Sequence, residues 1–140
     1  MEFNIGPEFS REFTFEEGRI TYKLADKLND FFKDKEYGER ILKIYISVIC
    51  VSKDFEAFCV VRPPKVLRNQ PALEYELKLD FDTFKPASEE ERKQLLVSKI
   101  FEVTKEVLMS KTIKGFEKEQ FIEDLESYFK EQGYLEKSLS

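Results

Sequence analysis

Residues 74–82 read Glu-Tyr-Glu-Leu-Lys-Leu-Asp-Phe-Asp, the most regular pattern in the chain. Every second side chain is hydrophobic, and the side chains between them are charged. Because side chains alternate between the two faces of a β-strand, a period of two places all the hydrophobic groups on one face. We therefore expect a strand in a sheet that is buried on one face and wet on the other. The hydrophobic set is Tyr75, Leu77, Leu79 and Phe81.

Two further strands are predicted before this one. Residues 41–51 (ILKIYISVICV) are rich in β-branched side chains, which favour a strand over a helix. Residues 57–62 (AFCVVR) follow after a short turn, so the pair is interpreted as an antiparallel hairpin. Pro63 and Pro64 then end the second strand, because proline has no N–H to donate to a neighbouring strand.

Two helices are predicted after the strands. Ser88 followed by Glu91 forms a capping-box pattern, and hydrophobic residues recur at helical spacing as far as about Ser110. A last helix is expected near 117–131, with Gly133 as its C-terminal cap.

The N-terminal part of the chain has two interpretations. Hydrophobic residues at steps of three and four predict a helix near 20–34, whereas the alternation over 19–24 also fits a strand. Residues 1–19 are expected to form an extended arm or an extra strand.

The order of elements is therefore helix, three strands, two helices within a single domain spanning residues 1–140. It predicts an α+β fold: one antiparallel sheet of three or four strands with the helices packed on one face.

Composition excludes several function classes. The 140 residues carry 28 acidic and 23 basic side chains, a net charge of −5, and this acidity disfavours a nucleic-acid binder. Histidine is absent, so Ser-His-Asp and Cys-His catalysis cannot operate within this chain. The five glycines are far apart, which excludes a phosphate-binding glycine-rich loop. We expect a protein that is not an enzyme and has no cofactor.

The same evidence predicts the compartment. No hydrophobic run approaches the ~18 residues of a membrane-spanning helix, and residues 1–10 do not resemble a signal peptide. The expected location is the cytoplasm, where Cys50 and Cys59 would be reduced thiols. These cysteines could form a redox pair, but two buried apolar side chains are the favoured interpretation. Without histidine they fall short of a zinc site.

The charged face of the 74–82 strand provides the first candidate site. Glu74, Glu76, Asp80 and Asp82 form a row with the spacing of an acid/base pair or a cation site, although Lys78 lies within it. A solvated sheet face is the commonest meaning of such a row, and a partner-binding surface is the leading functional one.

Two loops provide further candidates for partner binding. Arg62 and Arg68 bracket a proline-stiffened basic loop that could bind an acidic patch. Phe55 lies at the predicted hairpin tip among charged residues, where it could anchor a partner or fold back beneath the sheet.

The chain resembles the immunity proteins of bacterial polymorphic-toxin systems over residues 20–135. The resemblance is carried by the strand at 41–51, the run Phe58-Cys-Val-Val-Arg62-Pro-Pro, the strand at 75–81 and the two closing helices. It implies a non-enzymatic inhibitor that binds and neutralises a cognate protein toxin in the cytosol of the producing cell. If the toxin is a nuclease, its basic substrate groove would attract an acidic inhibitor.

Two other functions stay open. The groove between sheet and helices could hold a small ligand. Alternatively, an unpaired sheet edge could make the chain a regulatory subunit that assembles with itself, so a monomer and a homodimer are both compatible with the sequence.

Overall fold

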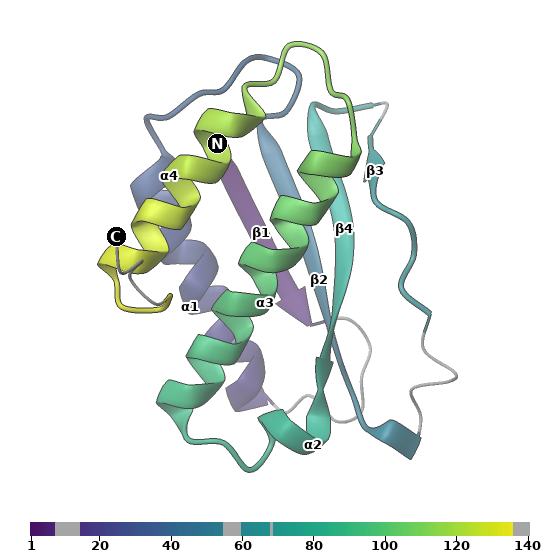
Figure 1. Ribbon diagram of the computed structural model, residues 1–140, viewed down its shortest axis with the longest axis vertical. Coiled ribbons are helices and arrows are strands. Elements are labelled where there is room, and N and C mark those ends of the chain that lie inside the picture. Colours follow the sequence, from purple (N-terminus) through teal and green to yellow (C-terminus); the bar gives the residue numbers. More distant parts are fainter. Residues whose placement is uncertain (8–14, 55–59, 68, 136–140) are drawn as a thin grey trace.

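The computed structural model describes residues 1–7, 15–54, 60–67 and 69–135 and confirms the α+β class (Figure 1). Within these residues, four strands and four helices follow one another: β1 (Glu2–Pro7), α1 (Phe15–Phe32), β2 (Lys43–Val51), β3 (Lys65–Val66), β4 (Ala72–Asp80), α2 (Phe81–Phe84), α3 (Glu89–Ser110) and α4 (Lys118–Glu131).

The strands form one mixed sheet in the order β1-β2-β4-β3. β2 runs parallel to both β1 and β4, and β3 alone is antiparallel to its neighbour β4. The expected antiparallel sheet is therefore corrected to a mixed one. Parallel neighbours need a long crossover, and α1 supplies the crossover between β1 and β2.

The predicted hairpin between 41–51 and 57–62 is wrong in its pairing. Both neighbours of β2 are parallel strands, β1 and β4. Residues 57–59 lie outside the described part, and 60–64 are not in a strand. The antiparallel pair is instead made by β3, where Lys65 lies opposite Glu74 and Val66 opposite Leu73. Pro63 and Pro64 were expected to end a strand, but they directly precede strand β3 instead.

At the N-terminus the extra-strand interpretation is confirmed, because β1 pairs with β2 at the edge of the sheet. The first helix begins at Phe15 rather than Ile20, and the alternative strand over 19–24 is wrong. The helical period holds because Leu24, Leu28 and Phe32 are all buried along one stripe of α1.

The outer edge of β1 is occupied by a side chain of α1. Asn29 accepts a hydrogen bond from the backbone N–H of Phe3 (2.5 Å) and donates one to the carbonyl oxygen of Phe3 (3.0 Å). The amide thus takes the place that a neighbouring strand would take at Phe3, which blocks this point of the edge against pairing with another chain.

The long helices pack on one face of the sheet, as the sequence predicted (Figure 1). An aromatic cluster joins them to it: Phe3 of β1 lies 5.3 Å from Phe32 of α1 and 6.0 Å from Phe121 of α4, measured between ring centroids. On β4, four alternating residues, Leu73, Tyr75, Leu77 and Leu79, are buried under the helices. Phe81 does not continue this row, because it begins α2.

The helix ends follow the sequence signals. Ser88 caps α3 by accepting a hydrogen bond from the N–H of Glu91 (3.2 Å), and its hydroxyl donates to the Glu91 carboxylate (2.9 Å). After α4, Gly133 adopts a φ of +80°, and the N–H of Tyr134 donates to the carbonyl of Phe129 (2.9 Å). This is the hydrogen-bond pattern of a Schellman cap, and it fixes the position of Tyr134.

Candidate partner-binding surface

Two of the predicted carboxylates, Glu74 and Glu76 of β4, lie on the face of the sheet that the described helices leave open. Since Leu73 and Tyr75 point toward the helices, the alternating Glu74, Glu76 and Lys78 point away from them. On β2 the opposite residues in the register are Tyr45, Ser47 and Ile49. We call this surface the open face; its members are Tyr45, Ser47, Ile49, Glu74, Glu76 and Lys78.

Glu76 does not lie in a wet surface, because only 6% of it is exposed. Its carboxylate accepts a hydrogen bond from the backbone N–H of Arg62 (2.6 Å) and one from the Arg62 guanidinium (2.9 Å). These bonds hold the segment after residue 60 against β4. Arg62 and Glu76, two predicted binding residues, are thus brought together as an ion pair that is buried on its acidic side.

The other two carboxylates of the row leave the open face. Asp80 caps α2 by accepting from the N–H of Asp82 (3.0 Å) and from the hydroxyl of Thr83 (2.9 Å). Asp82 lies in α2 rather than in the strand, and it accepts from the N–H of Lys53 (3.3 Å). Both are exposed, and we call Asp80 and Asp82 the α2 end of the open face. The open face and its α2 end together present Glu74, Asp80 and Asp82 to solvent.

A shallow hollow of about 210 Å³ lies beside this ion pair, between the segment that contains Pro63 and strand β4. Two acidic and two basic side chains line it: Glu74, Glu76, Arg62 and Lys65. The opposite charges sit side by side, which suits contact with another surface better than proton transfer between two carboxylates. Within the described residues, no group of three or more Cys, Asp or Glu side chains could hold a metal ion.

The remaining predicted residues divide into two groups. Cys50 is buried, 1% exposed, in agreement with its interpretation as a core residue. Phe55, Cys59 and Arg68 lie outside the described residues, so their predicted roles stay predictions.

The tyrosines with perturbed acidity belong to the core. Burial raises the pKa of Tyr75, whose hydroxyl makes a hydrogen bond with Thr104 inside the protein. Burial also raises the pKa of Tyr37, and so does its 2.6 Å hydrogen bond to the carboxylate of Asp124. Both phenols stay protonated and connect the helices to the rest of the core.

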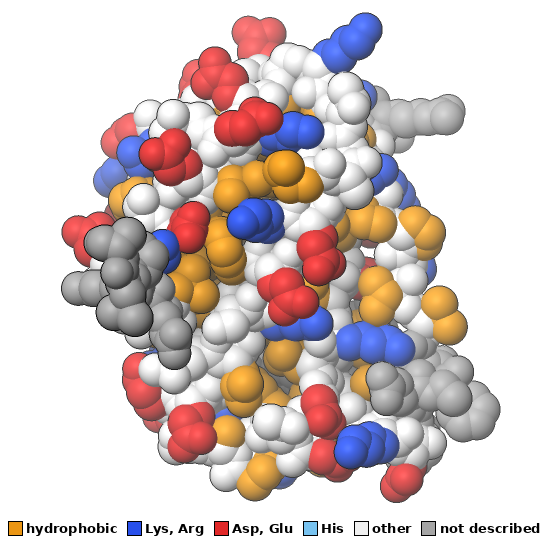
Figure 2. Space-filling view, in the orientation of Figure 1, with side chains coloured by type: hydrophobic (Ala, Val, Ile, Leu, Met, Phe, Trp, Pro, Cys, Tyr) orange, Lys and Arg blue, Asp and Glu red, His pale blue; other side chains and the backbone are white. Residues whose placement is uncertain are grey.

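One feature of the structure was not predicted: a cleft between α1 and α3 whose rim is basic. The spacing of Arg19, Lys23 and Lys27, each four residues apart, could have revealed it, because such residues share one face of a helix. Elsewhere on this side of the molecule, acidic, basic and hydrophobic side chains are interspersed (Figure 2).

In the described part of the chain, no helix is both long enough and apolar enough to span a bilayer. No curated protein and no solved structure shows significant similarity to the chain. The sequence model of one family, Immunity protein 44, does match, and it covers residues 1–131, nearly the whole chain. The chain therefore belongs to the Immunity protein 44 family.

Proposed function

We propose that this protein protects the bacterium that makes it by binding a cognate toxin in the cytoplasm and blocking the activity of that toxin. The observation that carries the proposal is the family match over residues 1–131. The resemblance noted from the strands and closing helices supports the same conclusion.

The proposed mode of action is binding without catalysis. The chain contains no histidine, Glu76 is engaged with Arg62, and Asp80 is engaged with the backbone N–H of Asp82, so these carboxylates are not paired as acid and base. The phenols with raised pKa are held in the core. These features support a protein that acts by binding a partner at its surface.

We place the toxin contact at the open face and its α2 end. Glu74, Asp80 and Asp82 are the accessible carboxylates there, and the net charge of −5 adds a long-range attraction for a basic toxin. Glu76 acts indirectly, by holding the Arg62 segment in place. A nuclease with a basic substrate groove would fit this surface.

The proposal is tested by co-expressing the protein with the toxins encoded beside its gene and measuring survival. Wild-type protein should restore growth with one of them. Growth arrest with every neighbouring toxin, although the protein is folded and abundant, would refute the proposed function.

The location of the contact is tested by charge reversal. E74K/D82K should lower the association rate with the toxin by about tenfold at low salt, because electrostatic steering is worth a factor of 10 or more. The matched control E106K/E123K makes the same change in net charge at exposed positions on α3 and α4. Equal association rates for the two variants would show that the toxin contact lies outside the open face.

A further inference from the structure

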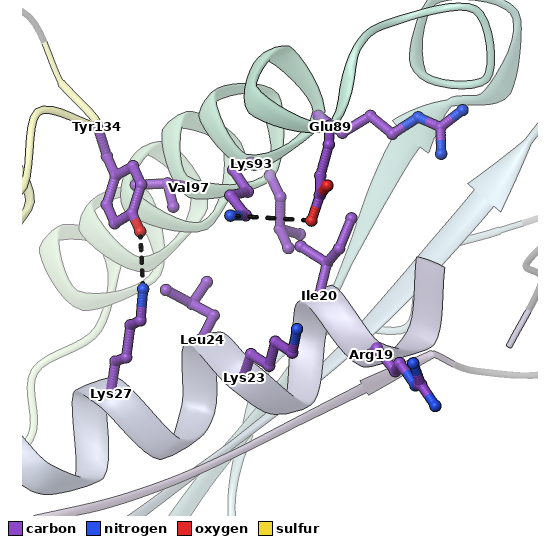
Figure 3. A pocket seen from close by; sticks show the side chains of 11 residues that line it. Arg19, Ile20, Lys23, Leu24, Lys27, Glu89, Lys93, Val97 and Tyr134 are labelled. Atoms are coloured by element: carbon purple, nitrogen blue, oxygen red, sulfur yellow. Dashed lines mark hydrogen bonds and ion pairs between the residues drawn. The ribbon is translucent and has the colours of Figure 1, made fainter. Parts of the chain in front are cut away.

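The basic cleft lies between the middle of α1 and the first half of α3 and has a volume of about 350 Å³. α1 and α3 form its two walls, and Tyr134, which follows the cap of α4, closes one end (Figure 3). Its bottom is formed by core residues that are almost completely buried, including Leu24 (6% exposed) and Val97 (1% exposed). Apolar side chains thus form the floor of the cleft and basic side chains its rim, so charge at the rim distinguishes one ligand from another.

The charge of the cleft opposes that of the whole protein. Among the described residues that line it, Glu89 is the sole acidic side chain. Five are basic: Arg19, Lys23, Lys27, Arg92 and Lys93. A local excess of positive charge on a chain with a net charge of −5 is the mark of a site for an anion.

The basic side chains have different tasks. Arg92 donates hydrogen bonds to the carbonyl oxygens of Phe84 and Lys85, and so joins α3 to α2. Arg19 points away from the cleft, whereas Lys23 and Lys27 extend from α1 toward α3 (Figure 3).

The ammonium groups inside the cleft are held only loosely. Lys27 donates to the hydroxyl of Tyr134 at 3.3 Å, and Lys93 lies 3.9 Å from the carboxylate of Glu89. Lys23 makes no hydrogen bond or ion pair with another described residue. An incoming anion can recruit these three lysines without breaking a strong contact, since exposed ion pairs contribute about 1 kcal/mol or less.

The arrangement of the lysines discriminates between kinds of anion. Lys23 and Lys27 are one helical turn apart, about 6 Å along α1, and Lys93 approaches from the opposite wall. A single phosphate needs donors that converge on one point, and these do not. A long nucleic acid would also have to pass the acidic side chains spread over the same face (Figure 2).

A short acidic peptide fits both constraints. Carboxylates at every second residue of an extended chain are about 6.6–6.8 Å apart, and carboxylates one turn apart on a helix are about 6 Å apart. Either spacing matches the lysine positions along α1.

We propose that the cleft between α1 and α3 binds an acidic peptide segment of a partner protein, held by Lys23, Lys27 and Lys93. This site is separate from the open face to which the toxin contact is assigned. It stands independently of the proposed function.

The test is an NMR titration of the ¹⁵N-labelled full chain with the peptide acetyl-(Glu-Ala)₅-amide, which carries carboxylates at both spacings. Amide signals of residues around the cleft, such as Lys23, Leu24 and Lys93, should shift. The apparent Kd should rise at least tenfold between 50 mM and 500 mM salt. K23E/K93E should weaken binding at least tenfold, and K23Q/K93Q, which leaves no new charge, should weaken it by a smaller factor.

Two controls and two competing ligands make the result decisive. K105E/K114E changes the net charge equally at exposed positions outside the cleft and should bind like wild type. Acetyl-(Gln-Ala)₅-amide should not bind. Shifts scattered over the surface, unchanged binding by the folded K23E/K93E or K23Q/K93Q proteins, or equal loss in K105E/K114E would overturn the proposal. Tighter binding of inorganic phosphate or of a ten-residue oligothymidylate at the same residues would also overturn it.

Discussion

Glu76 illustrates why a strand pattern predicts the direction of a side chain better than its environment. Period two correctly placed Glu76 on the face opposite the core, yet the residue is buried because the segment carrying Arg62 lies over it. That segment is distant in sequence, and its position depends on two hydrogen bonds that no local pattern encodes.

Replacing Glu76 with alanine tests this structural role. E76A leaves the backbone N–H of Arg62 without its acceptor, and we expect a loss of about 1–3 kcal/mol in the free energy of unfolding, measured by urea denaturation. E74A removes a neighbouring carboxylate that has no such role and should change stability by no more than about 0.5 kcal/mol. Equal effects of the two substitutions would show that the Arg62 contact adds nothing.

The tyrosines predict how stability depends on pH. The pKa values of Tyr37, Tyr75 and Tyr128 are raised, chiefly by burial, above the ordinary value of about 10. Below pH 10 these phenols are protonated in both states and stability is unaffected. Above it the unfolded chain releases protons that the folded chain retains, so stability falls as the pH rises.

Absorbance at 295 nm, which follows phenolate formation, measures this effect. Three of the six tyrosines should ionise only together with the loss of far-UV circular dichroism. Y75F should remove one phenolate from that late step. Ionisation of all six near pH 10 in a protein that remains folded would contradict the assignment.

At the scale of elements, sequence patterns predicted the buried faces and the ends of single helices and strands. They did not predict which strands pair or in which direction. The burial of alternate β4 residues, the Ser88 cap and the helix that ends before Gly133 all follow from local chemistry. The direction of β2 does not, because alternation is the same for parallel and antiparallel strands. The hairpin was inferred from closeness in sequence, whereas β2 pairs with β1 across a helix.

The loops depend on glycine at one point of close approach. Gly38 has a φ of +109°, and a Cβ there would lie 2.0 Å from the carbonyl oxygen of Gly115. The adjacent hydrogen bond from the N–H of Glu117 to the carbonyl of Tyr37 (2.8 Å) ties the same two loops together. Packing between the loop after α1 and the loop before α4 therefore requires the absence of a side chain.

Two alanine substitutions separate backbone conformation from this close approach. Gly133 also has a positive φ, +80°, but a Cβ there would meet no atom within 4 Å. G133A should cost about 1–2 kcal/mol for the left-handed conformation alone. G38A should cost at least about 3 kcal/mol, because the backbone must also shift. If G38A and G133A lose similar amounts of unfolding free energy, measured by thermal or urea unfolding, the backbone near Gly38 can move away from Gly115 without a loss of stability.

For the whole molecule, the family and its sheet-and-helix class could be anticipated from the sequence, but the two charged surfaces could not be assembled from it. The predicted acidic row divides between the open face and α2, because the strand ends at Asp80. The basic cleft draws on α1, α3 and Tyr134, three parts of the chain that meet only after folding. Surfaces of this kind depend on tertiary structure.

Titrating the purified cognate toxin with this protein tests most directly whether the protein acts by occupying the toxin. Because a tight inhibitor consumes one binding site for each molecule added, residual toxin activity should fall in proportion to the amount added. It should reach its minimum at a fixed stoichiometric ratio, independent of incubation time. A progressive loss of toxin activity at a small fraction of that ratio would contradict the account, since it would mean that each molecule inactivates many toxins in turn.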